Sequence, residues 1–176
     1  NRMNSDELIE KDFSFNVGLD WTWKEKIINK NNPSQADISI GQVIKFNEDP
    51  DMPTKSSLQN KNSDLVTKAT YLSPGNFDVT LKNTLDNGFN HVYYNDLNLK
   101  TFLKQGEINF NFYEKNSHIG NERYAKANLT SYLTDNTKLT ISTDRNLKSD
   151  LTNSHKLGIE NENECIRYGF YFQKNY

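Results

Sequence analysis

Residues 13–23 read FSFNVGLDWTW, and apolar and polar positions alternate through the whole stretch. Every second residue from Phe13 to Trp23 is apolar, and Ser, Asn, Gly, Asp and Thr fill the positions between them. Because successive side chains of a β-strand point to opposite faces, this period predicts a strand with one apolar face and one polar face.

The same period of two recurs along most of the chain. The alternation is weak only in the run near residue 158. The single segment that could form a helix is Ser5–Lys11, and it is short. No apolar run approaches the roughly 18 residues that a transmembrane helix needs. The pattern therefore predicts an all-β chain of about ten hairpin-linked strands. The runs cover residues 13–23, 36–46, 65–71, 77–85, 93–103, 108–113, 125–133, 139–143, 157–159 and 166–173.

The connections between the runs differ in length on the two sides of the predicted sheet. Tight turns alternate with longer polar loops, of which residues 47–64 form the longest. Bacterial outer-membrane barrels show this asymmetry, with short periplasmic turns and longer external loops. The connection over residues 24–35 is the misfit, because it is long but falls on the periplasmic side. The tight turns lie at residues 73–76, 104–106, 134–136 and 161–164, and the intermediate loops at 114–122 and 145–154.

The composition agrees with a one-sided sheet. Apolar residues make up 34% of the chain, below the usual share of about 45–50% in globular proteins. Aromatic residues reach 12%, which is more than disordered chains usually contain. The net charge of −2 leaves no basic footprint for nucleic acid, so we expect no nucleic-acid partner.

A soluble β-sandwich is the main rival, because it also alternates apolar and polar residues. Three features favour a membrane barrel: polar faces suited to a wet lumen, aromatic residues near run ends, and run lengths that match a tilted membrane crossing. We therefore predict a segment of an antiparallel transmembrane β-barrel, incomplete as it stands. A porin-like or receptor barrel and a soluble all-β binding module remain as alternatives.

The residue types that usually carry catalysis do not form recognisable motifs. His91, His118 and His155 lack the spacing of metal ligands. No serine lies in a nucleophile elbow, and no glycine-rich phosphate loop is present. The acidic stretch Glu160–Glu164 is too short for a calcium-binding EF-hand loop. We expect no catalytic, cofactor or metal site, and hence no enzyme.

Cys165 is the single cysteine of the chain. Free thiols tend to be oxidised in the periplasm, so an unpaired cysteine there suggests a partner elsewhere. The residue lies beside the predicted periplasmic turn at 161–164, where a soluble domain of the same protein could reach it.

Several short segments, in order, resemble the LptD family of outer-membrane lipopolysaccharide-assembly proteins in its alphaproteobacterial form. The resemblance extends over essentially the whole chain and is carried by the order and spacing of the segments. They are Asn1-Arg2 with Glu10 and Gly18-Leu19, Gly41-Gln42 with Pro50, Ser63–Val66, Leu157–Glu160, Asn163–Cys165, and the aromatic strand that ends at Gln173–Tyr176.

The resemblance implies a large barrel that follows a periplasmic β-jellyroll domain and encloses an outer-membrane lipoprotein plug of the LptE type. A periplasmic bridge protein of the LptA type would deliver lipopolysaccharide, which leaves for the outer leaflet through a lateral opening between the first and last strands. Lipopolysaccharide and outer-membrane lipids would then be its partners, and the bacterial outer membrane its location.

On this resemblance, residues 1–176 form a single segment of the barrel. They would be its late strands, without the N-terminal jellyroll, the early strands or the final strand. Cys165 is the one residue to which the resemblance gives a role, a disulfide with a cysteine of the periplasmic domain.

Overall fold

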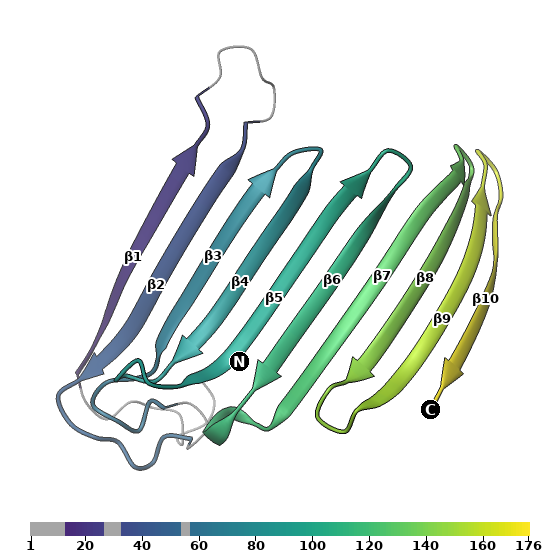
Figure 1. The fold of residues 1–176 in the computed structure, drawn as a ribbon. Coiled ribbons are helices and arrows are strands. Elements are labelled where there is room, and N and C mark those ends of the chain that lie inside the picture. The colour runs from purple at the N-terminus through teal and green to yellow at the C-terminus, as the bar shows by residue number, and fades with distance from the viewer. Residues whose placement is uncertain (1–12, 27–32, 54–56) are drawn as a thin grey trace.

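The computed structural model describes residues 13–26, 33–53 and 57–176 (Figure 1). Over these residues it consists of one ten-stranded antiparallel sheet, in which each strand pairs with its neighbours in sequence. The described part of the chain contains no helix long and apolar enough to cross a membrane. The short helix considered at Ser5–Lys11 lies outside the described residues.

The ten strands confirm the predicted all-β architecture, and a short 3-10 turn joins two of them. Their bounds are β1 Ser14–Lys24, β2 Gln35–Lys45, β3 Leu65–Ser73, β4 Phe77–Leu85, β5 Val92–Leu103, β6 Gly106–Lys115, η3 Ser117–Ile119, β7 Glu122–Thr134, β8 Thr137–Asn146, β9 Leu151–Glu162 and β10 Arg167–Asn175.

The strand β9 is much longer than the weak run at 157–159 predicted. It begins at Leu151, so the loop expected at 145–154 shrinks to residues 147–150. The register pairs Asp144 with Ser154 and Arg145 with Thr152. Polar residues occupy both faces at this end of the hairpin. Because apolar and polar residues do not alternate there, the sequence pattern did not reveal the strand.

All connections leave the sheet at one of two ends. The short-turn end carries residues 74–76, 104–105, 135–136 and 163–166, together with the β1–β2 connection at 25–34. The long-loop end carries residues 46–64, 86–91, 116–121 and 147–150. The β1–β2 connection keeps its unusual length, and the hydrogen bond from Glu25 N to Ser34 O at 2.9 Å extends the hairpin beyond its strands.

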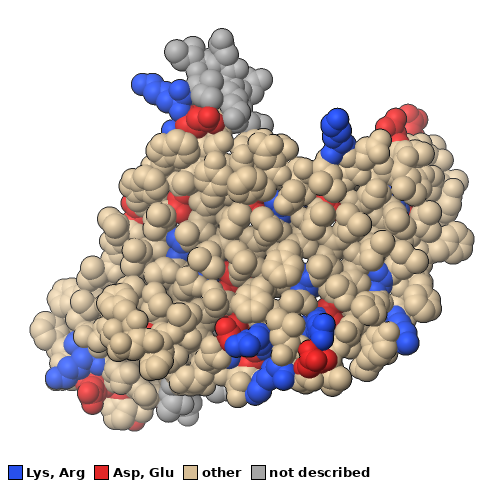
Figure 2. Space-filling model, viewed as in Figure 1, with Lys and Arg blue, Asp and Glu red and all other residues tan. Residues whose placement is uncertain are grey.

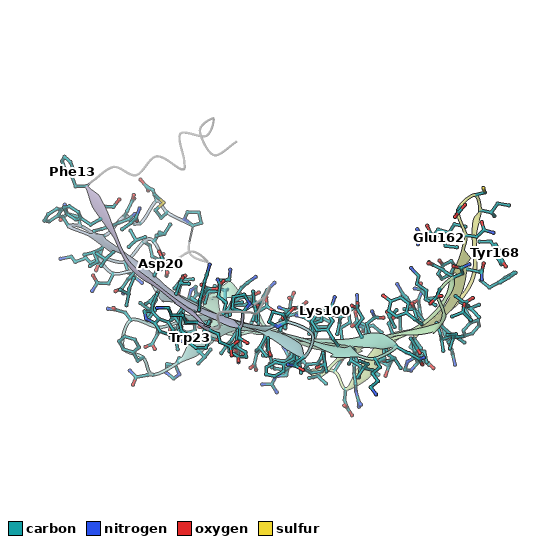
Figure 3. The ribbon with its side chains drawn as sticks, turned by 90° about the horizontal axis from the view of Figure 1, so that it is seen from above. Phe13, Asp20, Trp23, Lys100, Glu162 and Tyr168 are labelled. Carbon is teal, nitrogen blue, oxygen red and sulfur yellow. The ribbon has the colours of Figure 1, made fainter. Side chains whose placement is uncertain are left out.

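The sheet is a single curved layer with two different faces (Figure 3). Trp23 and Tyr168 project from its convex side, whereas Asp20, Lys100 and Glu162 project from its concave side. The register continues this division, because residues that pair across neighbouring strands share a face. One convex row runs through Trp21, Ile38, Ala69, Leu81, Leu97 and Phe112.

The convex side chains are exposed rather than packed into a core. Leu19 is 63% exposed and Phe170 is 75% exposed, and Met52 is the only buried apolar residue among those described. A soluble monomer rarely exposes so extensive an apolar surface. A sheet of this kind needs a lipid or protein environment on its convex side.

Gly106 marks a close approach between two strands. It begins β6, and a Cβ atom at this position would lie 2.1 Å from the backbone oxygen of Thr130 in β7. Only a residue without a side chain allows the strands to pair here. By contrast, a Cβ atom on Gly41 would meet nothing closer than the Val17 oxygen at 3.9 Å.

We therefore expect Gly106→Ala to lower the free energy of unfolding by about 1–3 kcal/mol, because the strands must move apart. The measurement is denaturant unfolding of the full-length protein in detergent, followed by tryptophan fluorescence. Gly41→Ala is the matched control and should change stability by no more than about 0.5 kcal/mol. Equal losses for the two variants would contradict the close approach.

Candidate functional site: the two faces of the sheet

The concave face is lined by charged and amide side chains from neighbouring strands. Acidic and basic residues are mixed along it, so that charges lie next to partners rather than in blocks. The register and Figure 3 place the following charged residues there: Asp20, Asp37, Lys68, Asp78, Lys82, Asp96, Lys100, Glu107, Lys126, Lys138, Asp144, Lys156, Glu160 and Arg167.

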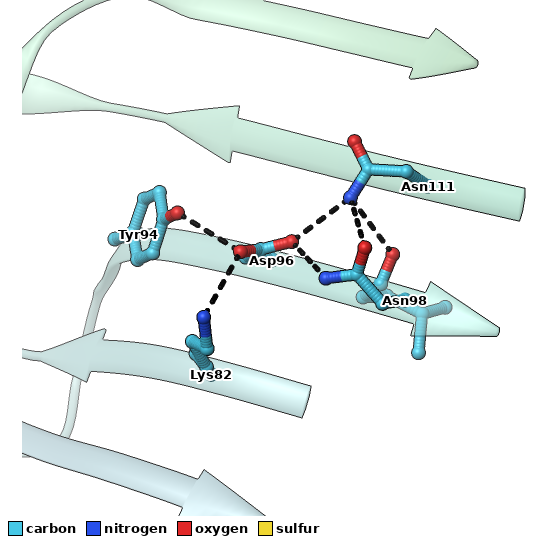
Figure 4. A network of polar contacts seen from close by, with 6 residues as sticks. Lys82, Tyr94, Asp96, Asn98 and Asn111 are labelled. Atoms are coloured by element: carbon cyan, nitrogen blue, oxygen red, sulfur yellow. Dashed lines mark hydrogen bonds and ion pairs between the residues drawn. The ribbon is translucent and has the colours of Figure 1, made fainter. Parts of the chain in front are cut away.

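Asp96 is the centre of a network that joins β4, β5 and β6 (Figure 4). Its carboxylate accepts hydrogen bonds from Asn98 Nδ2 at 2.8 Å, Asn111 Nδ2 at 3.1 Å and the Tyr94 hydroxyl at 3.2 Å. The Lys82 ammonium lies 3.9 Å from the same carboxylate. Asn111 also donates to the side-chain oxygen of Asn98 at 2.8 Å. The Asp96 side chain is only 14% exposed, so these contacts hold its charge in place.

A second centre, Glu160, joins β8, β9 and β10 near the short-turn end. Lys138 Nζ lies 2.6 Å and Arg167 Nη2 lies 2.9 Å from its carboxylate, and the Tyr171 hydroxyl also donates to it. The Tyr171 ring covers Gly158, where a Cβ atom would come within 2.8 Å of the ring. The glycine thus makes room for the ring that reaches Glu160.

A hollow of about 600 Å³ opens on the concave face between these two centres. Residues of β3 to β8 line it, including Thr80, Asn98, Lys126, Asn128 and Ser142. Within the described part of the chain, the side chains of Lys126, Asn128 and Ser142 form no hydrogen bond or ion pair. Their donors and acceptors are therefore available to a ligand.

A second hollow of about 470 Å³ lies over β1, β2 and β3. Gly18 and Gly41 pair directly across its floor, and neither carries a side chain that would fill it. Asp20, Ser39 and Lys68 belong to its lining. This part of the concave face has room for a side chain from a partner molecule.

The loops of the long-loop end are tied to one another. Gln42 Nε2 donates to the Ser63 carbonyl at 2.8 Å and to the Asn87 side chain at 2.9 Å. His118 Nε2 lies 3.0 Å from the Asp64 carboxylate. The backbone N–H of His91 donates to Asp86 at 2.7 Å and holds the pKa of that carboxyl below its ordinary value. The loops thus form a connected cover over this end of β2 to β6.

The histidines have structural surroundings in this arrangement. The ring of His118 meets Tyr93 edge-on, with the ring centroids 4.6 Å apart, and His155 meets Tyr176 at 5.7 Å. In the residues that the structure describes, no three His, Cys, Asp or Glu side chains are grouped as metal ligands.

Aromatic pairs lie near both ends of the convex face. Phe15 meets Phe46 at the long-loop end with ring centroids 5.7 Å apart, and Tyr71 meets Phe77 at the short-turn end at 5.6 Å. This placement agrees with belts at two membrane interfaces. Tyr132 is another aromatic residue near the end of a predicted run, but it lies on the concave face, where it pairs with Lys138, and so does not belong to these belts.

A comparison with models of protein families shows which family this chain belongs to. A family model described as LptD, LPS transport system D, matches residues 1–144. The chain belongs to the LptD family. No curated protein gives a significant match to the chain.

The family assignment tests several predictions that were made from the sequence. LptD proteins transport lipopolysaccharide and insert it into the outer membrane, so this chain is an outer-membrane, non-catalytic protein that handles lipopolysaccharide. The open ten-stranded sheet is consistent with an incomplete segment of the LptD barrel. The porin-like and soluble alternatives no longer apply.

Cys165 lies in the β9–β10 turn at the short-turn end, beyond the residues that the LptD family model matches. Its thiol is free and exposed. The Asn163 side-chain oxygen accepts the backbone N–H groups of Cys165 at 3.1 Å and Ile166 at 2.8 Å, which orders the turn. Since Cys165 is the only cysteine of residues 1–176, any disulfide that it forms would need a cysteine from outside this sequence.

The centres at Asp96 and Glu160 were not predicted from the sequence. The sequence could have placed Tyr94, Asp96 and Asn98 on one face of a strand, because residues two apart in a strand share a face. The contributions of Lys82 and Asn111 depend on the register of two other strands, which no local pattern specifies.

We expect Asp96→Ala to lower the free energy of unfolding of the full-length protein by about 1–3 kcal/mol, because three donors lose a charged acceptor. Denaturant unfolding in detergent measures the change. Lys82→Met is the control: its side chain is 48% exposed and its ion pair is long, so the loss should stay below about 1 kcal/mol. A larger effect for Lys82→Met than for Asp96→Ala would show that the ion pair, not the hydrogen-bond network, stabilises these strands.

Proposed function

We propose that this chain forms part of the barrel wall of a lipopolysaccharide translocon, with the concave face toward a hydrated lumen and the convex face toward lipid. The contrast between the two faces of one continuous sheet carries the proposal. Apolar convex side chains are stable against acyl chains, whereas the mixed charges and amides of the concave face require water or polar partners. In this arrangement the long-loop end faces the cell exterior, as in other bacterial barrels.

The lumen surface suits two polar occupants. Lys126, Asn128 and Ser142 present unused donors and acceptors, which match the hydroxyl groups of the saccharide portion of lipopolysaccharide. The side-chain-free floor at Gly18 and Gly41 provides space for residues of an LptE-like lipoprotein plug. An LptA-like bridge would deliver the lipid through a periplasmic domain of the same protein, and the energy for transport would come from elsewhere.

We further propose that residues 1–176 are one segment, the late strands, of an LptD barrel of the alphaproteobacterial type. The two outer strands support the segment assignment, because within the described residues β1 and β10 each pair on one side only. Unpaired strand edges are strongly disfavoured in lipid, so further strands of the protein must cover them. The order of the short sequence segments supports the alphaproteobacterial type.

Adjacent residues on opposite faces allow a direct test of the lumen assignment. A photo-crosslinking amino acid at Asn128 should capture lipopolysaccharide or the lipoprotein plug in cells, because this position lines the concave hollow. The same amino acid at Leu129, which lies on the convex face, is the matched control and should capture lipid but no plug. Plug captured from Leu129 but not from Asn128 would reverse the assignment of the faces.

We also propose that Cys165 forms a disulfide with a cysteine of the periplasmic domain. Its exposed thiol and the Asn163-ordered turn at the predicted periplasmic end support this pairing. The bond would hold the barrel and the domain in a defined relative position.

For this disulfide we expect that Cys165→Ser changes the mobility of the full-length protein on non-reducing gels, and that a reductant makes wild type and variant run alike. The substitution Asn163→Ser is the control for disturbance of the turn and should keep the thiol bonded. Identical mobility of wild type and Cys165→Ser without reductant would exclude the bond.

A further inference from the structure

Among the described strand residues, the charged side chains of the convex face are confined to the long-loop end of the sheet, over β6 to β10. In Figure 2 the middle of the face is mostly tan, and blue and red atoms gather along its lower edge beneath these strands, with others over the connections at the lower left and along the upper edge. The strand residues concerned are Glu114, Arg123, Arg145 and Lys174, and Lys148 and Asp150 follow in the β8–β9 loop.

Four cations of this region, Arg123, Arg145, Lys148 and Lys174, are called the basic rim below. Two acids accompany them, so the rim is net positive. Arg123 donates to Glu114, and Arg145 Nη2 lies 2.6 Å from Asp150. These arginines remain 51% and 48% exposed. Since a guanidinium has five donors, each pair leaves donors free for another acceptor.

The two lysines of the basic rim lack a carboxylate partner among the described residues. Lys148 Nζ lies 3.4 Å from the backbone oxygen of Asn121. Lys174 Nζ lies 4.5 Å from the centroid of the Tyr176 ring, whose edge also meets His155. An ammonium over an aromatic face keeps its charge and two or more donors toward solvent.

The position of the basic rim indicates its ligand. Farther along the same strands, toward the short-turn end, lie apolar residues such as Leu129, Ile141 and Leu157, which on the proposed orientation face acyl chains. The rim therefore lies at the depth of lipid headgroups, where Arg and Lys are favoured by anionic lipids. Guanidinium groups match phosphate in particular, because they bind its oxygens in a bidentate manner.

We infer that the basic rim binds the phosphate groups of lipid headgroups in the leaflet at the long-loop end. On the proposed orientation, this is the outer leaflet, and the phosphorylated lipid portion of lipopolysaccharide is the ligand. The short-turn end of the convex face has no comparable rim in the described strands, since it presents Trp23, Phe77, Leu103 and Tyr168. The exposed cations of the short-turn end, Lys24, Lys26 and Lys104, lie at a concave strand position or in connections, so the convex positions of the described strands are basic only at the long-loop end.

The rim also lies on one half of the sheet. At the same end, β1 and β2 present Phe15 and Ile44 on the convex face rather than charges. Headgroup binding is therefore confined to strands next to the unpaired edge of β10. A glycolipid bound there would be held beside that part of the barrel wall after it has entered the leaflet.

The test is equilibrium binding of a fluorescent lipid A to the detergent-solubilised full-length protein, followed by polarisation. The variant combines Arg123→Gln, Arg145→Gln and Lys174→Gln. We expect bisphosphorylated lipid A to bind about tenfold more weakly to this variant, allowing for the existing ion pairs. Lipid A without phosphates should bind wild type and variant equally.

The matched control combines Lys24→Gln, Lys26→Gln and Lys104→Gln, which removes three exposed cations at the short-turn end. It should bind bisphosphorylated lipid A like wild type. Retained heat-modifiable migration on gels shows that each variant is folded. If the triple variant does not fold, the single variant Arg145→Gln replaces it, and we expect its affinity for bisphosphorylated lipid A to fall about twofold to threefold.

Equal affinity of wild type and triple variant for bisphosphorylated lipid A would overturn the inference. An equal loss for the phosphate-free lipid would do the same, because it would show a general effect on lipid binding. Complete displacement of lipid A by inorganic phosphate at equal concentration would also overturn it, by showing a free-phosphate site instead. None of these results depends on the lumen assignment, which the crosslinks from Asn128 and Leu129 test separately.

Discussion

The hydrogen-bonding requirement of the backbone in lipid governs this structure. Each N–H and C=O group that enters the membrane must find a partner within the protein, and a continuous antiparallel sheet supplies those partners strand by strand. The uninterrupted order from β1 to β10 follows from this requirement. The same requirement disfavours the unpaired outer edges of β1 and β10 in lipid, which is why we propose that further strands cover them.

Because the sheet pairs the backbone groups with one another, the side chains of its two faces can differ and suit two different environments. The convex face exposes Leu19 and Phe170 without a core to bury them, and on the proposed orientation lipid covers them. The concave face holds its charges through short-range networks at Asp96 and Glu160. Local neutralisation of this kind leaves other groups of the concave face, such as Lys126, free for the saccharide or plug that we propose as lumen partners.

The charged residues on the convex face fit the same division between solvents. Arg123 and Arg145 lie at the long-loop end of the apolar band and not within it, which is where we infer that headgroups bind. Glycine has a specific part at close contacts: Gly106 lets β6 approach β7, and Gly158 accepts the Tyr171 ring. Transport, lipid contact and strand pairing thus use different side chains of the same ten strands.

Much of this protein could be predicted from the sequence alone. The period of two determined the strands, as at Phe13–Trp23 and at 77–85, because alternation is a local property of a strand in a two-solvent environment. It failed at β9, where Thr152 and Ser154 belong to a strand whose end is polar on both faces. The resemblance to LptD proteins was likewise visible in short ordered segments, and the family match over residues 1–144 confirms it.

Tertiary structure alone decided which residues meet across strands. Lys82, Asp96 and Asn111 come from three strands, and Lys138, Glu160 and Arg167 from three others, so their contacts depend on register rather than on neighbours in sequence. The basic rim likewise required the alignment of β6 to β10. Sequence determined the two faces of each strand because that choice is local, and the register decided the sites because they form between strands.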